Sequence, residues 1–292
     1  MPEGPGRLAV RKTYKLYIGG AFPRSESGRS YVVASCGGAV LANVAQASRK
    51  DLRDAVVAAR KAQPGWAAAT AYNRGQVIYR VAEMLEGRHA QFAYLLEVAD
   101  GLDHRAAALV VSAAVDRLVW YAGWADKYAQ VAGSANPVAG PYFDFSVPEP
   151  TGVVGVLAPQ ASSLLGLVSV LAPVITTGNA AVVVASEARP LPALELAEVL
   201  GTSDVPAGVV NILSGRTDEL APVLAAHRDV EAIDLAGASS QSTADLEMAA
   251  AGNVKRVLRP AAGPEPDWTG EPGPARMLFF VETKTVWHPI GA

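Results

Sequence analysis

Hydrophobic and polar positions follow two different periods along this chain. From about residue 50 to residue 131, apolar residues recur every three or four positions, which is the period of an amphipathic helix. Leu52, Val56 and Ala59 mark one face of the first helix, and Pro64-Gly65 is expected to close it. Two further apolar stripes predict helices, one with Val77, Val81, Met84 and Leu85, and a longer one with Val111, Val115, Leu118, Val119 and Ala122.

After Thr151 the pattern changes to short β-rich runs that alternate with helices. Ser162, Thr217 and Ser239 are the expected caps of three of these helices. The strand candidates are residues 153–157, 181–184, 209–213, 232–235 and 254–258. Such alternation predicts βαβ units and a parallel sheet. The expected fold class is therefore α/β, a doubly wound Rossmann-like sheet with N-terminal helices, which binds ligands at the carboxyl ends of its strands.

Two alternating strands lie outside this unit, at Tyr142–Val147 and Leu278–Trp287. The segment before the second strand is rich in proline and glycine and is expected to be an extended linker spanning roughly 50 Å. The predicted division is 1–140 for the N-terminal strands and helices, 141–150 for the first outlying strand, 151–259 for the parallel sheet, 260–276 for the linker and 277–292 for the last strand.

Composition excludes several classes of function. The net charge is -3 and no run of lysine or arginine is present, so a nucleic-acid interface is not expected. Residues 150–186 carry no charge, but prolines and glycines interrupt them, which favours a buried strand-helix-strand unit over a membrane span. The single cysteine, Cys36, and the lack of a secretory signal predict a cytoplasmic protein. Four scattered histidines predict no metal site.

Several longer runs resemble the aldehyde dehydrogenase superfamily. These are Tyr121–Lys127, Glu149–Gly155, Pro206–Ile212 and Gly252–Val257, and the resemblance covers about residues 15–259. Glu282–Val286 is similar to the C-terminal strand of that family. The resemblance implies a cofactor-binding half from which the catalytic domain is missing, with residues 260–276 in its place.

The chemistry of the family needs a thiolate nucleophile, a general base and an oxyanion-stabilising amide. The resemblance places the cysteine beyond residue 260, where this chain has none, and Cys36 is expected to be structural. At the position where the family carries its general-base glutamate, this chain has Arg259-Pro260. Glu265 lies nearby in the linker and is a poor candidate for that role. Gln160 stands near the asparagine position, displaced by one residue. No catalytic residue is therefore predicted, and an active enzyme is not expected.

The resemblance also implies an NAD site of which only some residues are kept. Glu187 keeps the acid that holds the adenosine ribose, although an ordinary acid at a helix start is an equal alternative. Gly237 keeps one glycine of the phosphate turn, and Ser242 stands at the second glycine position. The residual NAD residues are predicted to be Pro159, Glu187, Gly237, Ser239 and Ser242, with weak or no binding and no metal.

In the family the two outlying strands form an arm that joins the sheet of a neighbouring subunit. The residues predicted to do so here are Phe143, Phe145, Phe279, Val281, Thr283, Val286 and Trp287. Pairing with another chain would protect an otherwise marginal sheet with exposed edges. The alternative is an ordinary edge strand folded onto its own domain. The leading hypothesis is a non-catalytic subunit of a full-length aldehyde dehydrogenase; a stand-alone nucleotide-binding module and an oxidoreductase with a shared site are the alternatives.

Overall fold

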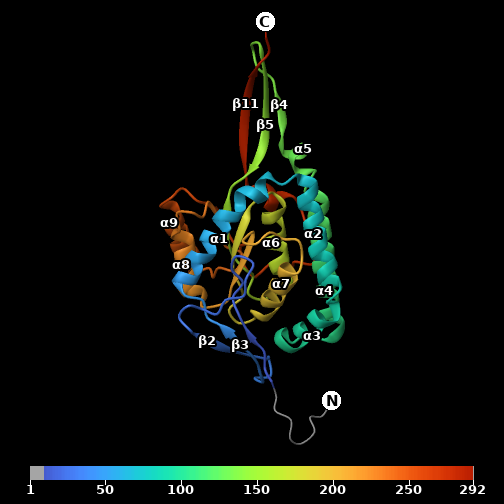
Figure 1. The fold of residues 1–292 in the computed structure, drawn as a ribbon, viewed down its shortest axis with the longest axis vertical. Helices are drawn as coiled ribbons and strands as arrows, with labels where there is room; N and C mark the ends of the chain where they lie inside the picture. Colours follow the sequence, from blue (N-terminus) through green and yellow to red (C-terminus); the bar gives the residue numbers. More distant parts are fainter. Residues whose placement is uncertain (1–9, 292) are drawn as a thin grey trace, which may run out of the picture.

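The computed structural model describes residues 10–291. The chain begins with a three-stranded sheet in the order β1-β3-β2, made of β1 (Thr13–Tyr14), β2 (Ser30–Ala34) and β3 (Val40–Ala45). Tyr17 joins this sheet to the body, since its backbone exchanges hydrogen bonds with Ile212 at 2.9 and 2.8 Å. The small sheet lies at the end of the molecule where the described chain begins (Figure 1).

The predicted helical region contains five helices, including two, α3 and α5, that the periodicity did not separate. They are α1 (Arg49–Ala68), α2 (Ala71–Glu86), α3 (His89–Asp100), α4 (His104–Trp124) and α5 (Tyr128–Ala132). The predicted end of the first helix at Pro64-Gly65 is wrong, because α1 contains Pro64 and continues to Ala68. Its last turn is held by tertiary packing: Trp66 is buried and its indole donates to the Ile175 carbonyl at 2.8 Å.

The parallel sheet is confirmed. Its strands are β6 (Val153–Leu157), β7 (Ala180–Val184), β8 (Val210–Leu213), β9 (Ala232–Asp234) and β10 (Arg256–Leu258), in the order β10-β9-β6-β7-β8. All four pairings are parallel. The crossover helices are α6 (Leu165–Thr176), α7 (Leu191–Gly201), α8 (Thr217–Ala226) and α9 (Thr243–Ala251). Strand order reverses beside β6, the position where doubly wound sheets bind ligands.

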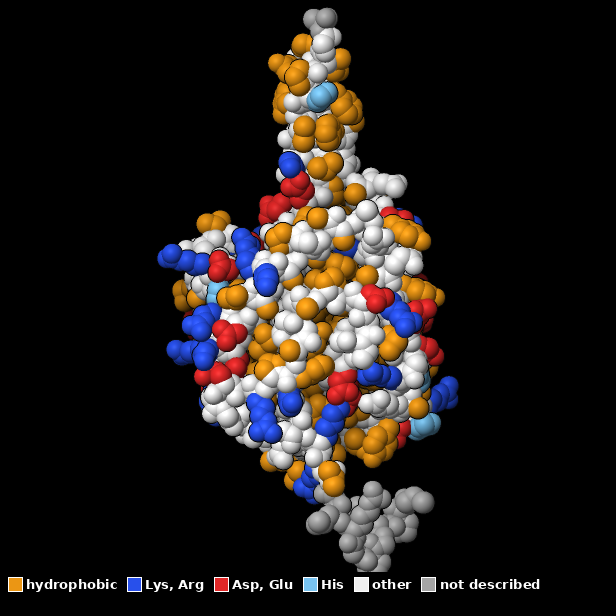
Figure 2. All heavy atoms as spheres, viewed as in Figure 1, with side chains coloured by type: hydrophobic (Ala, Val, Ile, Leu, Met, Phe, Trp, Pro, Cys, Tyr) orange, Lys and Arg blue, Asp and Glu red, His pale blue; other side chains and the backbone are white. Residues whose placement is uncertain are grey.

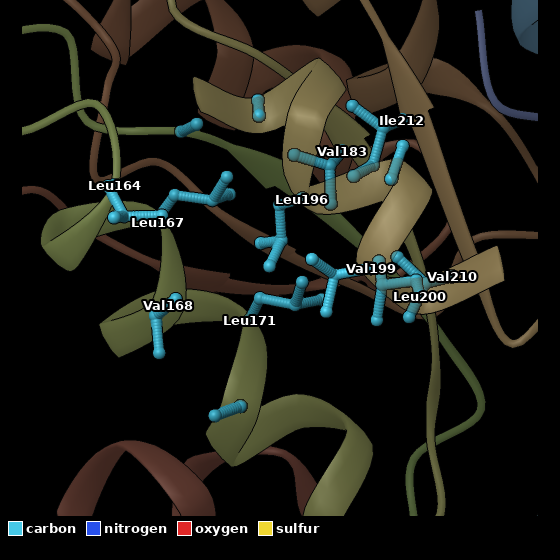
Figure 3. Close-up of a cluster of buried hydrophobic side chains, with 14 of the residues drawn as sticks. Leu164, Leu167, Val168, Leu171, Val183, Leu196, Val199, Leu200, Val210 and Ile212 are labelled. Atoms are coloured by element: carbon cyan, nitrogen blue, oxygen red, sulfur yellow. The ribbon is translucent and has the colours of Figure 1, made fainter. Parts of the chain in front are cut away.

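Two apolar layers bury the two faces of this sheet. On one face, side chains of α6 and α7 pack with those of α2, α3 and α4 over Val154, Val156 and Val183. Figure 3 shows the part of this layer in which Leu171 of α6 and Leu196 of α7 lie near Val183 of β7. On the other face, α1 and α8 cover Val153 and Val182. Alternate residues of one strand thus enter opposite layers, which explains why β6 and β7 read as continuous apolar runs.

Helix α4 is the one described helix that is long and apolar enough to cross a membrane by length and composition. In the structure it packs against α2, α3 and α6. Its buried face carries Ala107, Val111, Ala114 and Leu118. These contacts give α4 the place of a core helix in this domain.

The outlying strands form a three-stranded antiparallel arm in the order β11-β5-β4, from β4 (Ser134–Asn136), β5 (Tyr142–Pro150) and β11 (Val281–Pro289). The arm projects away from the body (Figure 1). Only Thr151 and Gly152 separate β5 from β6. The Thr151 amide donates to the Phe280 carbonyl at 3.2 Å, and the Gly152 amide donates to Asn179 Oδ1 at 2.7 Å. The base of the arm is therefore tied to the central sheet.

Residues 259–274, here called the strap, do not form the extended linker that the proline content predicts. Arg117, a buried residue of α4, donates to the carbonyls of Trp268 and Gly270, at 2.7 Å each. The short helix α10 (Ala275–Phe279) follows and packs against α6, so the predicted strand start at residue 278 is also wrong. The anchoring residue, Arg117, lies on α4 and is far from the prolines in sequence. Local composition therefore could not predict that the strap is docked.

Candidate functional site

A cavity of about 1090 Å³ lies at the carboxyl end of the parallel sheet and is called the cleft below. Its walls come from β2, the loop after β7, the start of α8, the glycine turn after β9, and α9. Of the predicted cofactor residues, Glu187, Gly237, Ser239 and Ser242 line it. Pro159 does not; it is buried beside the start of α6, while its neighbour Gln160 lines the cleft.

Glu187 is held by two groups of α8 and its approach. Its Oε2 accepts from the Thr217 amide at 2.9 Å, and its Oε1 pairs with the Arg216 guanidinium. The carboxylate therefore caps the N-terminus of α8, the crossover helix that follows β8. The prediction that Thr217 is itself the cap is wrong: Thr217 is the first residue of α8, and Glu187 supplies the acceptor.

The turn after β9 makes a close backbone approach. A Cβ on Gly237 would lie 1.9 Å from the Ala158 carbonyl oxygen, so only glycine fits there. Beyond it, Ser239 Oγ and Ser242 Oγ lie 2.9 Å apart, and the Ser239 carbonyl accepts from the Ser242 and Thr243 amides at 3.1 Å each. Helix α9 starts at Thr243, four residues after the predicted cap at Ser239.

Both polar atoms of the Gln160 side chain bind backbone groups. Its Nε2 donates to the Ala158 carbonyl at 2.8 Å, and its Oε1 accepts from the Glu187 amide at 3.1 Å. These bonds join the ends of β6 and β7. The side chain is thus a bridge between two loops in this structure, rather than an amide directed at a reacting group.

The strap contacts the turn before α6, which begins at Leu165. Glu265 accepts from the amides of Ala161 at 2.9 Å and Ser162 at 2.8 Å, and also from the Trp268 indole at 3.1 Å. The predicted cap, Ser162, does accept from the Gly166 amide at 2.9 Å, one turn further on. Glu265 therefore ties the strap to the turn that precedes α6.

Cys36 lies in the turn between β2 and β3. Its Sγ donates to the Ala99 carbonyl at 3.5 Å and lies close to the backbone of Gly101, which has a positive φ. Cys36 lines neither the cleft nor the chamber of about 300 Å³ beneath the strap. Within residues 10–291, no three His, Cys, Asp or Glu side chains gather in a way that could hold a metal.

One buried ion pair sits beside the site on the strap side of the sheet. Asp234 of β9 is fully buried and pairs with Arg276 of α10, which also stacks over the Trp268 ring. Burial raises the pKa of the Asp234 carboxyl above its ordinary value, while Arg276 opposes that shift. The pair fastens α10 and the strap to the sheet.

Three of the residues predicted for the arm surface, Phe143, Thr283 and Trp287, are exposed, and Phe145 and Val286 are half-buried. Phe143 and Phe145 stack at 5.4 Å, and Trp287 packs edge-on to Tyr142 at 5.7 Å. Half or more of Phe143 and Trp287 is exposed, and hydrophobic atoms crowd the arm in Figure 2. Val286 lies opposite Phe145 in the register, and Thr283 opposite Pro148.

Two of the predicted arm residues do not contribute to its exposed surface. Phe279 is in α10 and packs against the core, and Val281 is buried at the base of β11. Both residues were assigned to the arm surface from the predicted strand that starts at Leu278, but β11 starts three residues later, at Val281. The exposed arm surface therefore belongs to β5 and to β11 beyond Val281.

Sequence reasoning missed the charged residues around the cleft and the anchors of the strap. Arg216, Asp218, Glu219 and Asp245 all line the cleft. The signal available was their position: three of them directly follow the glycine after β8, and Asp245 lies in the first turn of α9. Arg117 gave no signal, since an arginine on a helix reads as a solvated residue.

A five-stranded parallel sheet with a cleft at its switch point defines a dinucleotide-binding type of domain. The comparison with family models matches residues 22–266 to the aldehyde dehydrogenase family. This chain belongs to the aldehyde dehydrogenase family. It spans about half the length of the curated relatives it matches.

Three relatives illustrate the match. Cytosolic aldehyde dehydrogenase 1 of Elephantulus edwardii is 32% identical over 88% of this chain and 52% of that protein. The mitochondrial aldehyde dehydrogenase of Rattus norvegicus is 33% identical over 83% of this chain and 49% of that protein. The structure of a Bacillus cereus aldehyde dehydrogenase in complex with NAD+ superimposes with a TM-score of 0.79, at 28% identity, covering 84% of this chain and 50% of that one.

Proposed function

We propose that this chain is a non-catalytic member of the aldehyde dehydrogenase family that assembles with a full-length aldehyde dehydrogenase through its arm. The observation that carries the proposal is the route of the chain from β10 to β11. Twenty-two residues, 259–280, connect Leu258 to Val281 and form the strap and α10. This segment contains no cysteine, and its Glu265 is bound to the amides of Ala161 and Ser162, so it offers neither the expected nucleophile nor a free base.

The exposed arm supports the second part of the proposal. A three-stranded sheet that leaves the body gains little from its own core. Its outer strand, β11, has an exposed outward edge, and Phe143 and Trp287 expose apolar surface. A partner sheet would pair the edge and bury these side chains. A full-length aldehyde dehydrogenase is the partner we propose, and a cytoplasmic location stays a prediction.

We also propose that NAD binding is weak or lost. Glu187 is already bound to Arg216 and the Thr217 amide, so a ribose diol would compete with both. Ser242 adds a side chain at the position expected to be glycine. The Gly237 turn keeps its glycine, but its close approach is to the Ala158 carbonyl of the protein itself.

Co-expression with a full-length aldehyde dehydrogenase, followed by native mass measurement, tests the assembly. We expect a hetero-oligomer with the intact chain and its loss with Phe143→Ser/Trp287→Ser. Tyr72→Ser/Tyr94→Ser is the matched control, since it removes two exposed aromatics from α2 and α3 and leaves the arm intact. Separate migration of the intact chain, or aldehyde-dependent NADH formation by the purified chain alone, contradicts the proposal.

A second candidate function is a nucleotide-binding or sensing module, and the volume of the cleft favours it. Calorimetry on the purified chain separates the two functions, because this candidate requires ligand binding without any partner. Assembly and ligand binding are measured independently.

A further inference from the structure

Strand β2 is an edge strand that borders the cleft. The small sheet has the order β1-β3-β2, so β2 pairs with β3 and has no strand on its other side. Residues 31–34 all line the cleft, although the side chains of a strand alternate between two faces. The strand therefore presents its backbone edge to the cavity. An ion pair of 3.0 Å between Arg29 and Glu219 of α8 holds β2 in this position.

The backbone groups on this edge point away from β3. The Gln46 amide donates to the Arg29 carbonyl at 3.0 Å, which makes these two residues a hydrogen-bonded pair of the antiparallel ladder. Such pairs alternate along a strand, so Tyr31 and Val33 bond to β3 and Val32 does not. The Val32 amide and carbonyl are therefore directed outward, and 56% of this residue is exposed. An outward row of donors and acceptors is a template for one more strand.

The other walls of the cleft carry an excess of negative charge. The charged residues that line it are Glu187, Asp218, Glu219, Asp245 and Arg216. Arg216 is paired with Glu187, and Glu219 is paired with Arg29. Asp218 and Asp245 are exposed and have no such partner within residues 10–291. Two uncompensated carboxylates thus share the cavity with the free edge of β2.

We propose that the cleft binds an extended, basic peptide segment of a partner protein, which adds to β2 as a fourth strand of the small sheet. The outward amide and carbonyl of Val32 provide main-chain hydrogen bonds, and Asp218 and Asp245 attract lysine or arginine side chains. Val33 and Leu246 offer apolar lining to the side chains between them.

The size of the cleft fits such an occupant. Its volume of about 1090 Å³ exceeds the roughly 300–1,000 Å³ that is typical of small-molecule pockets. At about 3.3 Å per residue, the edge formed by residues 31–34 spans roughly 13 Å, so a segment of about four to six residues matches it.

Peptide binding goes beyond the proposed assembly and does not depend on it. The small sheet and the arm lie at opposite ends of the molecule (Figure 1), so the peptide and an arm-bound subunit would occupy separate surfaces. Loss of peptide binding and loss of assembly are therefore separate failures.

Calorimetry of the full chain with three blocked peptides of about six residues tests the proposal. The first alternates lysine and valine, the second alternates glutamate and valine, and the third is the lysine peptide N-methylated at every residue. We expect the lysine peptide to bind at least about tenfold more tightly than the other two at low ionic strength, and more weakly at about 0.3 M salt. N-methylation removes the backbone donors and keeps the charge, so equal binding of the third peptide overturns strand addition. The absence of lysine-peptide binding overturns the whole proposal.

A substitution on the edge tests the same contact from the side of the protein. Val32→Pro removes the outward amide without removing a bond to β3, which an edge strand tolerates. This variant should bind the lysine peptide at least about tenfold more weakly, because the main-chain contact is lost. Val32→Thr keeps the amide and should bind as the unmodified chain does. Unimpaired binding by a Val32→Pro chain that melts normally refutes the β2 contact, and if this chain unfolds, the N-methylated peptide decides the point.

A charge-removing variant tests the role of the acidic walls. Asp218→Asn/Asp245→Asn should weaken binding of the lysine peptide about tenfold, roughly threefold for each exposed charge removed. Asp204→Asn/Asp229→Asn removes the same charge from exposed positions outside the cleft and should leave the affinity unchanged. An equal loss in both double variants would mean that net charge, and not the cleft walls, attracts the peptide, and would refute the proposed site.

Discussion

At the scale of single residues, the Asp234–Arg276 pair has the largest predictable effect. Arg276→Met removes the partner of a fully buried carboxylate and should lower the free energy of unfolding by about 3–5 kcal/mol near neutral pH. In this variant burial alone raises the Asp234 pKa, so the folded state binds a proton more tightly than the unfolded state, and stability should recover as pH falls below 7. Urea unfolding at several pH values measures this, with Asp234→Asn/Arg276→Met as the variant that should not recover at low pH.

A second buried charge predicts the opposite trend with pH. Lys255 is buried, its Nζ donates to the His227 carbonyl at 2.8 Å and to the Val230 carbonyl, and burial lowers its pKa to about 8. Between this value and the ordinary 10.5, the unfolded chain binds more protons than the folded chain, so this residue should make stability rise as pH increases through that range. Chemical denaturation from pH 7.5 to about 10 checks the slope. Lys255→Met should remove that part of the slope, and an unchanged slope contradicts the assignment.

At the scale of elements, the strap should behave as a docked segment rather than a free linker. Arg117→Met removes the bonds to the Trp268 and Gly270 carbonyls and to Ser169, and should cost about 2 kcal/mol. Amide hydrogen exchange should rise within residues 260–274 and stay unchanged in β6 and β7. Arg80→Met removes an exposed arginine from α2 and is the control. Fast exchange of the strap in the unmodified chain would show that the docking does not hold in solution.

The parallel sheet could be predicted because its central strands β6 and β7 are buried on both faces and are therefore apolar throughout. The limits of the predictions also have physical causes. Periodicity placed Phe279 in a strand, but the α10 packing against α6 makes that residue helical. Proline content predicted an extended strap, yet Arg117, more than 140 positions earlier, holds it in place. The negative charge of the cleft could not be predicted, because Asp218 and Asp245 are far apart in sequence and are brought to one cavity only by the packing of α8 and α9.

At the scale of the whole molecule, assembly should depend on the β11 edge of the arm. Thr285→Pro removes a backbone donor from the middle of β11 and should weaken arm-dependent assembly at least about tenfold, because proline is poorly tolerated inside a sheet. Sedimentation of the co-expressed complex measures the loss. Thr285→Val keeps the strand and should assemble normally. Circular dichroism and thermal melting of the Thr285→Pro chain should show that the body stays folded, and unimpaired assembly would place the contact elsewhere.

The two-residue junction between β5 and β6 has a mechanical consequence. Gly152 and Thr151 are anchored to Asn179 and Phe280, so the arm cannot swing independently of the central sheet. A subunit bound to the arm would therefore be held at a fixed distance and angle from the cleft. Ligand binding in the cleft could then affect a subunit bound to the arm only by deforming β6. The arm is therefore better suited to fixing the position of a bound subunit than to transmitting a signal to it.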